Sequence, residues 1–145
     1  MADQLDYLPL LSQLETVIPP FTVDGVLVEG DYAPTRSDFE DRFVSPLSLS
    51  RPDIYSGWNN HREALIADGL RPECRQLLNG SFTTAKTHPN DIDLAVEVPV
   101  DAPTLSRADP IVRLLHGRLM KSRFRCDAYP LFTLPLDHPD YDRVT

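Results

Sequence analysis

Cysteine is scarce in this sequence, because Cys74 and Cys126 are the only two among 145 residues. Two cysteines cannot form the disulfide framework that stabilises many small secreted domains. The sequence also contains no secretory signal and no apolar run long enough to cross a bilayer. These absences favour a cytoplasmic protein with no membrane-spanning segment.

Positive charge is also in short supply. Fourteen lysines and arginines stand against twenty-two aspartates and glutamates, which gives a formal net charge of −8. This balance argues against broad binding to nucleic acid or to an anionic membrane, since both are polyanions. A small nucleotide that carries its own metal ion is still compatible, because local charge decides the binding of a small ligand.

Histidines at metal-ligand spacing are missing, so a zinc site is not expected. Cys126 has no histidine placed by sequence to activate it, and Ser81 lacks the Gly-x-Ser-x-Gly elbow of many hydrolases. The sequence therefore gives no support to a thiol nucleophile or a serine hydrolase. The four histidines stand apart from one another, at His61, His88, His116 and His138.

The composition is that of an ordinary globular protein, with 41% hydrophobic and 25% charged residues. A chain of 145 residues fits one domain. We expect an α/β (α+β) domain with three parts: a mainly helical support over 1–70, a catalytic sheet over 71–135 and a polar tail over 136–145.

Hydrophobic spacing predicts the elements of the N-terminal half. Leucines three and four residues apart predict a helix within residues 1–18. The Asp24-Gly25 pair predicts a turn between two short strands. Thr35 can cap a helix over 36–44, and a longer helix is predicted from Ser50 to Gly69.

The C-terminal half reads as alternating strands and helical or loop segments. Apolar residues at every second position between Asp91 and Val98 are typical of a strand, with the acidic side chains on its other face. A Pro- and Asp-rich loop follows. The expected elements are a strand at 77–78, a strand over 91–98, a loop over 99–108, a helix around 111–119 and a strand over 124–134.

The stretch from Gly80 to Leu94 carries most of the chemical information. Asp91 and Asp93 are two residues apart on a predicted strand, so their carboxylates point to the same face. Adjacent carboxylates repel, and Mg²⁺ or Mn²⁺ is the usual compensation. Gly80 and Ser81, a short loop earlier, can offer backbone N–H groups and a hydroxyl to a phosphate.

A third acid, Asp127, lies on the last predicted strand. If that strand is a neighbour of the one holding Asp91 and Asp93, the three carboxylates suit two-metal phosphoryl transfer. Asp91 and Asp93 would then bind both ions, while Asp127 would bind the ion on the nucleophile side and accept the proton. Lys86 would reach a phosphate as a mobile positive charge.

Each part of this pattern also has a plain structural explanation. An isolated Asp-x-Asp pair is often a solvated strand end, and an isolated Gly-Ser pair is often a turn. Their combination within one loop of nine residues, followed by Asp127 on a predicted strand, favours a functional site.

These residues resemble the motifs of the DNA polymerase β-like nucleotidyltransferase superfamily, and within it the minimal nucleotidyltransferases. They are closer still to an uncharacterised prokaryotic family of nucleotidyltransferase-like proteins, DUF6932. The segments that carry the resemblance are Gly80–Lys86, Pro89–Leu94 and Phe124–Asp127, and further matches upstream extend it over about residues 18–130. The resemblance implies a small mixed β-sheet flanked by helices, dependence on Mg²⁺ and a nucleoside triphosphate as donor.

The resemblance also implies an activity. We expect transfer of a nucleotidyl group, with AMP from ATP as the favoured case, to a protein, RNA or nucleotide hydroxyl in a toxin–antitoxin or phage-defence system. One departure from the superfamily is that three uncharged residues, 82–84, separate Gly-Ser from the basic Lys86. Selection of the acceptor is expected in the N-terminal third or on a protein partner. The alternatives are a catalytically weak or inactive nucleotide- or partner-binding module with the same fold, and a nuclease or phosphohydrolase.

Overall fold

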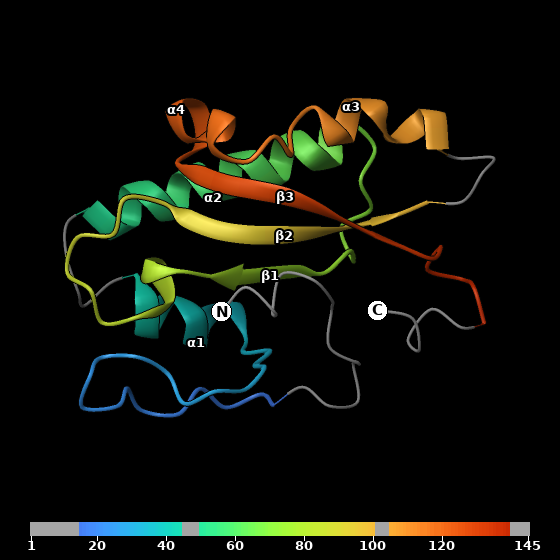
Figure 1. Cartoon of the computed structure of the whole chain (residues 1–145). Helices are drawn as coiled ribbons and strands as arrows, with labels where there is room; N and C mark the ends of the chain where they lie inside the picture. The colour runs from blue at the N-terminus through green and yellow to red at the C-terminus, as the bar shows by residue number, and fades with distance from the viewer. Residues whose placement is uncertain (1–14, 45–49, 101–104, 140–145) are drawn as a thin grey trace.

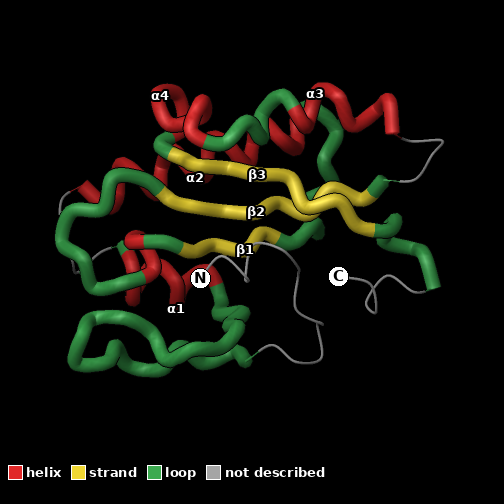
Figure 2. The backbone as a smooth tube through the Cα atoms, viewed as in Figure 1, coloured by secondary structure: helices red, strands yellow, loops and turns green. Residues whose placement is uncertain are grey.

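A three-stranded sheet forms the centre of the protein. The computed structural model describes residues 15–44, 50–100 and 105–139. The strands follow the order β1 (Gln76–Asn79), β2 (Ile92–Pro99) and β3 (Cys126–Thr133) across the sheet. β1 is antiparallel to β2, whereas β3 is parallel to β2 (Figure 1). The three strands lie side by side (Figure 2). The predicted class, a small mixed sheet with helices, is therefore confirmed.

Two helices precede the sheet, close to their predicted positions. The helix α1 covers Arg36–Phe43, and the Thr35 hydroxyl caps it by accepting a hydrogen bond from the Asp38 amide. The helix α2 covers Ser50–Ala67 and contacts β2, β3 and α4. It ends at Ala67, and Gly69, two residues further on, has a φ of +112° that favours glycine.

The core lies between α2 and the sheet, and β2 is its most buried strand. Ile92, Leu94, Val96 and Val98 are at most 1% exposed and form the apolar face predicted from the sequence. The opposite face of β2 is more buried than an acidic face would suggest, because Glu97 is 0% exposed. Burial of both faces makes β2 the central strand of the core, and one of the predicted acids, Asp93, lies on it.

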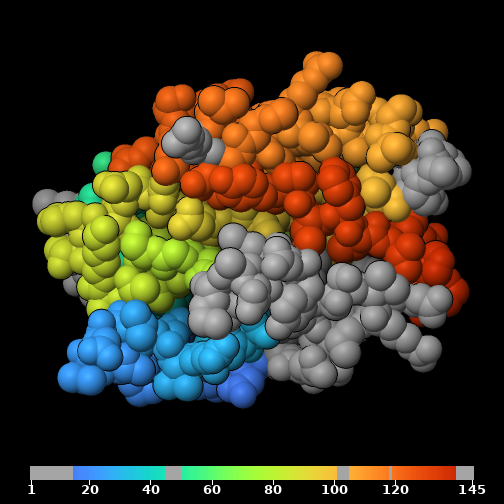
Figure 3. Space-filling view, in the orientation of Figure 1, coloured from blue at the N-terminus to red at the C-terminus, as the bar shows by residue number. Residues whose placement is uncertain are grey.

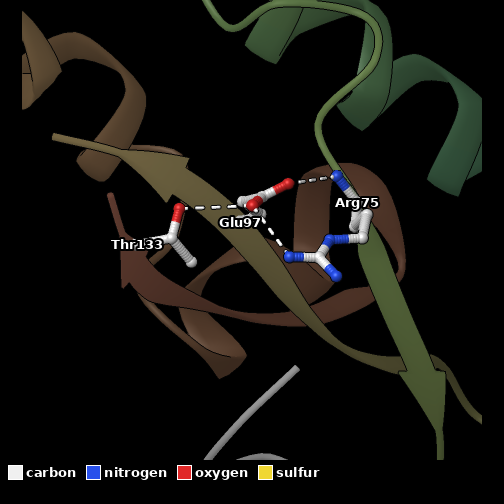
Figure 4. A network of polar contacts seen from close by, with 3 residues as sticks. All are labelled: Arg75, Glu97 and Thr133. Atoms are coloured by element: carbon white, nitrogen blue, oxygen red, sulfur yellow. Dashed lines mark hydrogen bonds and ion pairs between the residues drawn. The ribbon is translucent and has the colours of Figure 1, made fainter. Parts of the chain in front are cut away.

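Glu97 is stabilised in the core by hydrogen bonds from Arg75, the residue before β1, and from Thr133, the last residue of β3. Its carboxylate accepts from the Arg75 backbone N–H at 2.9 Å and from the Arg75 guanidinium at 3.3 Å. The Thr133 hydroxyl on β3 donates to the same carboxylate at 3.2 Å (Figure 4). A buried carboxylate is tolerated when it is paired and hydrogen-bonded in this way.

The N-terminal predictions were partly wrong. The Asp24-Gly25 turn forms, with Gly25 at a φ of +78°, but the two strands beside it do not. Most of the helix predicted within 1–18 lies outside the described residues, and its described end, 15–18, is not helical. Glu15 instead pairs with Tyr32 in an isolated bridge, which uses the backbone groups that a helix would need.

The continuous helix predicted around 111–119 was also wrong. The helix α3 covers only Asp109–Val112. Gly117, at a φ of +58°, then leaves helical geometry and donates its N–H to the Ala128 carbonyl of β3 at 2.7 Å. The chain resumes as a 3₁₀ turn, η5 (Arg118–Met120), and a short helix, α4 (Lys121–Phe124). The backbone bond to β3 therefore divides the helix in two.

The connections around the last strand differ in smaller ways. β3 begins at Cys126, two residues later than predicted, because Phe124 ends α4 and Arg125 adopts the left-handed conformation at a φ of +56°. The predicted loop over 99–108 contains a 3₁₀ turn, η4 (Leu105–Ala108), and its residues 101–104 lie outside the described part. The predicted tail is described only as far as residue 139.

The space-filling view shows the orange atoms of the segment that contains α3 and α4 along the upper margin of one face (Figure 3). The red atoms of β3 and the residues after it run across the face below them, and the blue atoms of the irregular N-terminal stretch lie at the lower margin.

Within the described ranges, no helix has the length and apolar character needed to span a bilayer.

Candidate functional site

The structure brings the three predicted acids together at one end of β2 and β3. Asp93 and Asp127 are register partners on these parallel strands, and Asp91 immediately precedes β2. Each of the three acids offers a carboxylate oxygen within 4.8 Å of the others. The Asp91 side chain is 11% exposed and that of Asp127 is 18% exposed, so both are largely shielded from water.

Gly80 places the backbone of the preceding loop directly against this cluster. It follows Asn79, the register partner of Asp93, at the end of β1. Its φ of +79° and ψ of −161° fall in a region that only glycine adopts readily. A Cβ at this position would overlap the Asp93 carboxylate and lie 2.9 Å from its Cγ. Both the conformation and the close approach therefore require glycine.

The loop after Gly80 folds on itself through its own hydroxyl groups. It begins with a 3₁₀ turn, η3 (Ser81–Thr83). Thr83 Oγ1 donates to the Gly80 carbonyl at 3.1 Å, and Thr84 Oγ1 donates to the Ser81 carbonyl at 2.7 Å. Ser81 is half-buried, whereas the Lys86 side chain is exposed and makes no ion pair with the described residues. We call residues 80–86 the Gly-Ser loop.

Arg51, which the sequence did not single out, holds the Gly-Ser loop in place. It lies in the first turn of α2 and is 0% exposed. Its guanidinium donates to the carbonyls of Phe82 at 2.7 Å and Thr84 at 2.8 Å, and to that of Lys86 at 2.7 Å. It also donates to the Phe43 carbonyl at the end of α1, at 2.7 Å. Arg51 thus ties the loop to both N-terminal helices.

Lys121 is a second residue that sequence reasoning missed. Its Nζ lies 2.7 Å from Asp91 Oδ2 and 3.7 Å from Asp127 Oδ2. The side chain is 45% exposed, so solvent reaches it while it contacts the cluster. The lysine that contacts the acids is thus Lys121 of α4, which contacts two of them. Lys86, the lysine predicted for the site, contacts none of the three.

The charges of the cluster perturb one another. Burial raises the pKa of Asp93, and the negative charges of Asp91 and Asp127 raise it further. A hydrogen bond to Asp91 raises the pKa of Lys121, which keeps its ammonium protonated. These shifts reflect an excess of negative charge that one ammonium only partly neutralises.

The donor set fits a hard divalent cation. Asp127 Oδ1 is buried and has no hydrogen-bond partner within the part of the chain that the structure describes. A buried carboxylate oxygen without a partner is costly unless a cation or a proton satisfies it. Three carboxylates of this kind are the oxygen ligands that Mg²⁺ and Mn²⁺ prefer.

Two further residues near the cluster, Cys126 and Tyr129, have side chains whose pKa is raised. Burial raises the pKa of the Cys126 thiol to about 12, which keeps it protonated, in agreement with the prediction of a buried strand thiol. A hydrogen bond with Asp127, followed by burial, raises the pKa of Tyr129. Within the described residues, the grouping suited to a metal contains these three acids and no histidine.

A sizeable pocket lies beside the acids rather than over them. It has a volume of about 710 Å³ and is lined by residues of the N-terminal loop, α1, α2 and β1. It meets the candidate site at Gly80, Thr83 and Thr84, but none of the three acids lines it. The position of the acids, rather than the size of this pocket, therefore defines the site.

Fold and site together define an α+β domain whose mixed sheet carries three converging carboxylates beside a glycine loop. The model of a family described as "Family of unknown function (DUF6932)" matches residues 19–143. The chain belongs to this family, as its motifs predicted. Comparisons with curated proteins and with solved structures gave no match.

Proposed function

We propose that this protein is a divalent-metal-dependent nucleotidyltransferase that uses a nucleoside triphosphate, with ATP as the favoured donor of AMP. The observation that carries the proposal is the convergence of Asp91, Asp93 and Asp127 directly beside the backbone of Gly80. The resemblance to the DNA polymerase β-like superfamily supports it, since the same residue types occur in the same order there. The nucleotidyltransferase fold is part of this proposal.

Asp91, Asp93 and Asp127 would hold Mg²⁺ or Mn²⁺. When bound, the metal lowers the pKa of an attacking hydroxyl and neutralises charge on the leaving pyrophosphate. The protein's own groups would position the donor: the Ser81 hydroxyl and the backbone N–H groups of Ser81 and Phe82 would contact its phosphates. The other N–H groups of the Gly-Ser loop already donate within the protein. The exposed Lys86 adds a mobile positive charge.

The reaction joins an acceptor hydroxyl oxygen to the α-phosphorus of the triphosphate, and the bond to the bridging oxygen of pyrophosphate breaks. The hydroxyl proton passes to Asp127, whose Oδ1 has no hydrogen-bond partner among the described residues. Pyrophosphate leaves with the electron pair of the broken bond. A protein, RNA or nucleotide hydroxyl serves as acceptor, and a toxin–antitoxin or phage-defence role in the cytoplasm belongs to the same proposal.

Incubation with α-labelled and γ-labelled nucleoside triphosphates in Mg²⁺ or Mn²⁺ tests the proposal. Candidate acceptors include RNA, free nucleotides and partner proteins. We expect pyrophosphate release and an acceptor that carries the α-label but not the γ-label. Asp93→Asn should abolish both signals, whereas the exposed Asp137→Asn should retain them. Absence of α-label transfer and pyrophosphate release with every donor and acceptor would overturn the proposal.

The ion pair between Lys121 and Asp91 favours a second candidate, a partner-binding module that keeps the fold without turnover. Such a module needs no metal, because the lysine already neutralises part of the cluster. Thermal unfolding with and without ATP and Mg²⁺ separates the two, since a ligand that binds only the folded state raises its stability. Metal-dependent cleavage of nucleic acid or phosphate esters without a nucleoside triphosphate would instead indicate a hydrolase.

A further inference from the structure

Lys121 contacts the acid cluster at the position where a metal would compete with it. Its ammonium lies 2.7 Å from Asp91 Oδ2 and 3.7 Å from Asp127 Oδ2. A divalent cation bound by the same two carboxylates would stand close to this ammonium, and like charges at such separations repel strongly. The ammonium and the metal therefore cannot both keep these contacts.

Backbone contacts on both sides of Lys121 hold this residue beside the acid cluster. Gly117 ends the preceding segment by donating to the Ala128 carbonyl of β3 at 2.7 Å, so the chain that leads to Lys121 is fixed to the strand that carries Asp127. After α4, a Cβ on Gly57 of α2 would lie 2.9 Å from the Phe124 carbonyl carbon, which shows how closely α2 packs there. The backbone on both sides of Lys121 is thus anchored.

The side chain itself can leave without disturbing that anchor. Lys121 is the first residue of α4, and its side chain is 45% exposed. Its flexible stem can turn the ammonium away from Asp91 without loss of core contacts. The Gly-Ser loop has uncharged residues at 82–84 and an exposed lysine at 86, so it lacks a basic side chain near its start.

We propose that Lys121 is a displaceable internal counter-ion: it neutralises Asp91 and Asp127 in the metal-free protein, and metal entry releases it to bind the phosphates of the triphosphate. This inference rests on the proposed function, because it assumes that the three acids bind metal. It assigns to Lys121 the positive charge that the start of the Gly-Ser loop lacks. Metal binding and nucleotide binding would then be coupled through one side chain.

Two substitutions of Lys121 and one matched control test the first half of the inference. Mn²⁺ titrations without nucleotide, followed by electron paramagnetic resonance, compare the wild type with Lys121→Met, Lys121→Gln and Lys86→Met. Removal of the competing ammonium should tighten Mn²⁺ binding by about tenfold in both Lys121 variants. Lys86→Met removes an equal charge from an exposed side chain outside the cluster, so its effect should be much smaller. Unchanged or weaker Mn²⁺ binding in the Lys121 variants would overturn the inference.

The second half is tested by calorimetric binding of a non-hydrolysable ATP analogue at saturating Mn²⁺. The Lys121 variants should bind the analogue about tenfold more weakly than the wild type, because a phosphate contact is lost. Equal affinity in variant and wild type would remove the phosphate-binding role. Circular dichroism and urea unfolding confirm that each variant is folded.

The readouts distinguish this inference from the function on which it rests. If the wild type binds Mn²⁺ and Asp91→Asn abolishes that binding, the metal site stands even when no nucleotidyl transfer is detected, and the Lys121 comparison remains decisive. If the wild type binds no Mn²⁺, the inference and the proposed metal-dependent function both fail.

Discussion

Asp93 of β2 and Asp127 of β3 lie directly opposite each other in the parallel register. Parallel pairing puts the two side chains on the same face of the sheet, at the strand ends where Asp91 also lies. Without a metal, this arrangement places three carboxylates against a single ammonium. The cluster therefore costs stability in the metal-free protein and gains it when a cation binds.

Asp127→Asn should separate these two effects. The substitution keeps the shape of the side chain and removes one charge, so we expect equal or higher metal-free stability than in the wild type. At MgCl₂ concentrations of about a hundred times Kd, the wild type should gain roughly 2.7 kcal/mol, and the variant should lose most of that gain. Urea unfolding with and without MgCl₂ measures both values. Asp137→Asn, at an exposed position, should behave as the wild type. A full metal-dependent gain in Asp127→Asn would contradict the assignment of Asp127 as a ligand.

Gly80→Ala should damage both the fold and the site. The backbone conformation alone costs an alanine on the order of 1–3 kcal/mol, and the overlap with the Asp93 carboxylate adds to this cost. We expect destabilisation of at least about 2 kcal/mol together with loss of Mn²⁺ binding, measured by urea unfolding and titration.

Gly69→Ala is the matched control for Gly80. Gly69 also has a positive φ, at +112°, but a Cβ there would meet nothing within 4 Å. It should therefore lose stability through backbone strain while Mn²⁺ binding stays unchanged. If the two glycine variants bind Mn²⁺ equally well, the close approach of Gly80 to Asp93 has no role in the site.

Arg51→Met should destabilise the protein more than an exposed arginine variant. Its guanidinium satisfies carbonyls of α1 and of the Gly-Ser loop in a fully buried position. Each abandoned carbonyl costs about 1 kcal/mol or more, so the total should reach at least about 3 kcal/mol. Urea unfolding provides the measurement. Arg36→Met removes an exposed arginine that donates to Tyr55 and Asn59, and should cost about 1 kcal/mol or less. Similar losses in the two variants would contradict the role of Arg51.

His61 should make stability depend on pH. It is 0% exposed, and burial lowers its pKa below the ordinary value of 6.5. Between the lowered pKa and pH 6.5, His61 is therefore protonated in the unfolded chain and neutral in the folded protein. Stability from the neutral imidazole is full above about pH 6.5 and falls as the pH drops toward the lowered pKa.

A comparison of variants isolates this effect. His61→Gln should flatten the decline in unfolding free energy between about pH 7 and pH 5, whereas the exposed His116→Gln should leave the slope unchanged. Denaturant unfolding across that range supplies the slopes. A decline of equal steepness in wild type and His61→Gln would assign the pH dependence to other groups.

The acids of the site could be predicted because their signals are local. A spacing of two residues puts Asp91 and Asp93 on one face of a strand, whatever the rest of the chain does. Asp127 required one more assumption, that its strand is a neighbour of β2, and the register confirms it. The helices after Thr35 and from Ser50 were predicted for the same reason, since caps and periodic apolar residues lie within each segment.

Lys121 and Arg51 could not be predicted, because their contacts depend on tertiary structure. Lys121 reaches the acids only because Gly117 bonds to Ala128 and interrupts a helix that the apolar spacing favours. Arg51 binds backbone carbonyls, which every residue has and which leave no pattern in the sequence. The sequence alone does not distinguish a buried arginine in the first turn of a helix from an exposed one.

The hydrogen bonds of Arg51 also couple the Gly-Ser loop to the N-terminal helices. One side chain of α2 joins the end of α1 to residues 82–86, so we expect the conformation of the loop to depend on docking of the N-terminal helices. Amides of the loop should therefore exchange with deuterium through the same cooperative opening as those of α2, rather than through local fluctuations. Any ligand that stabilises the loop would slow exchange in a helix that it never touches.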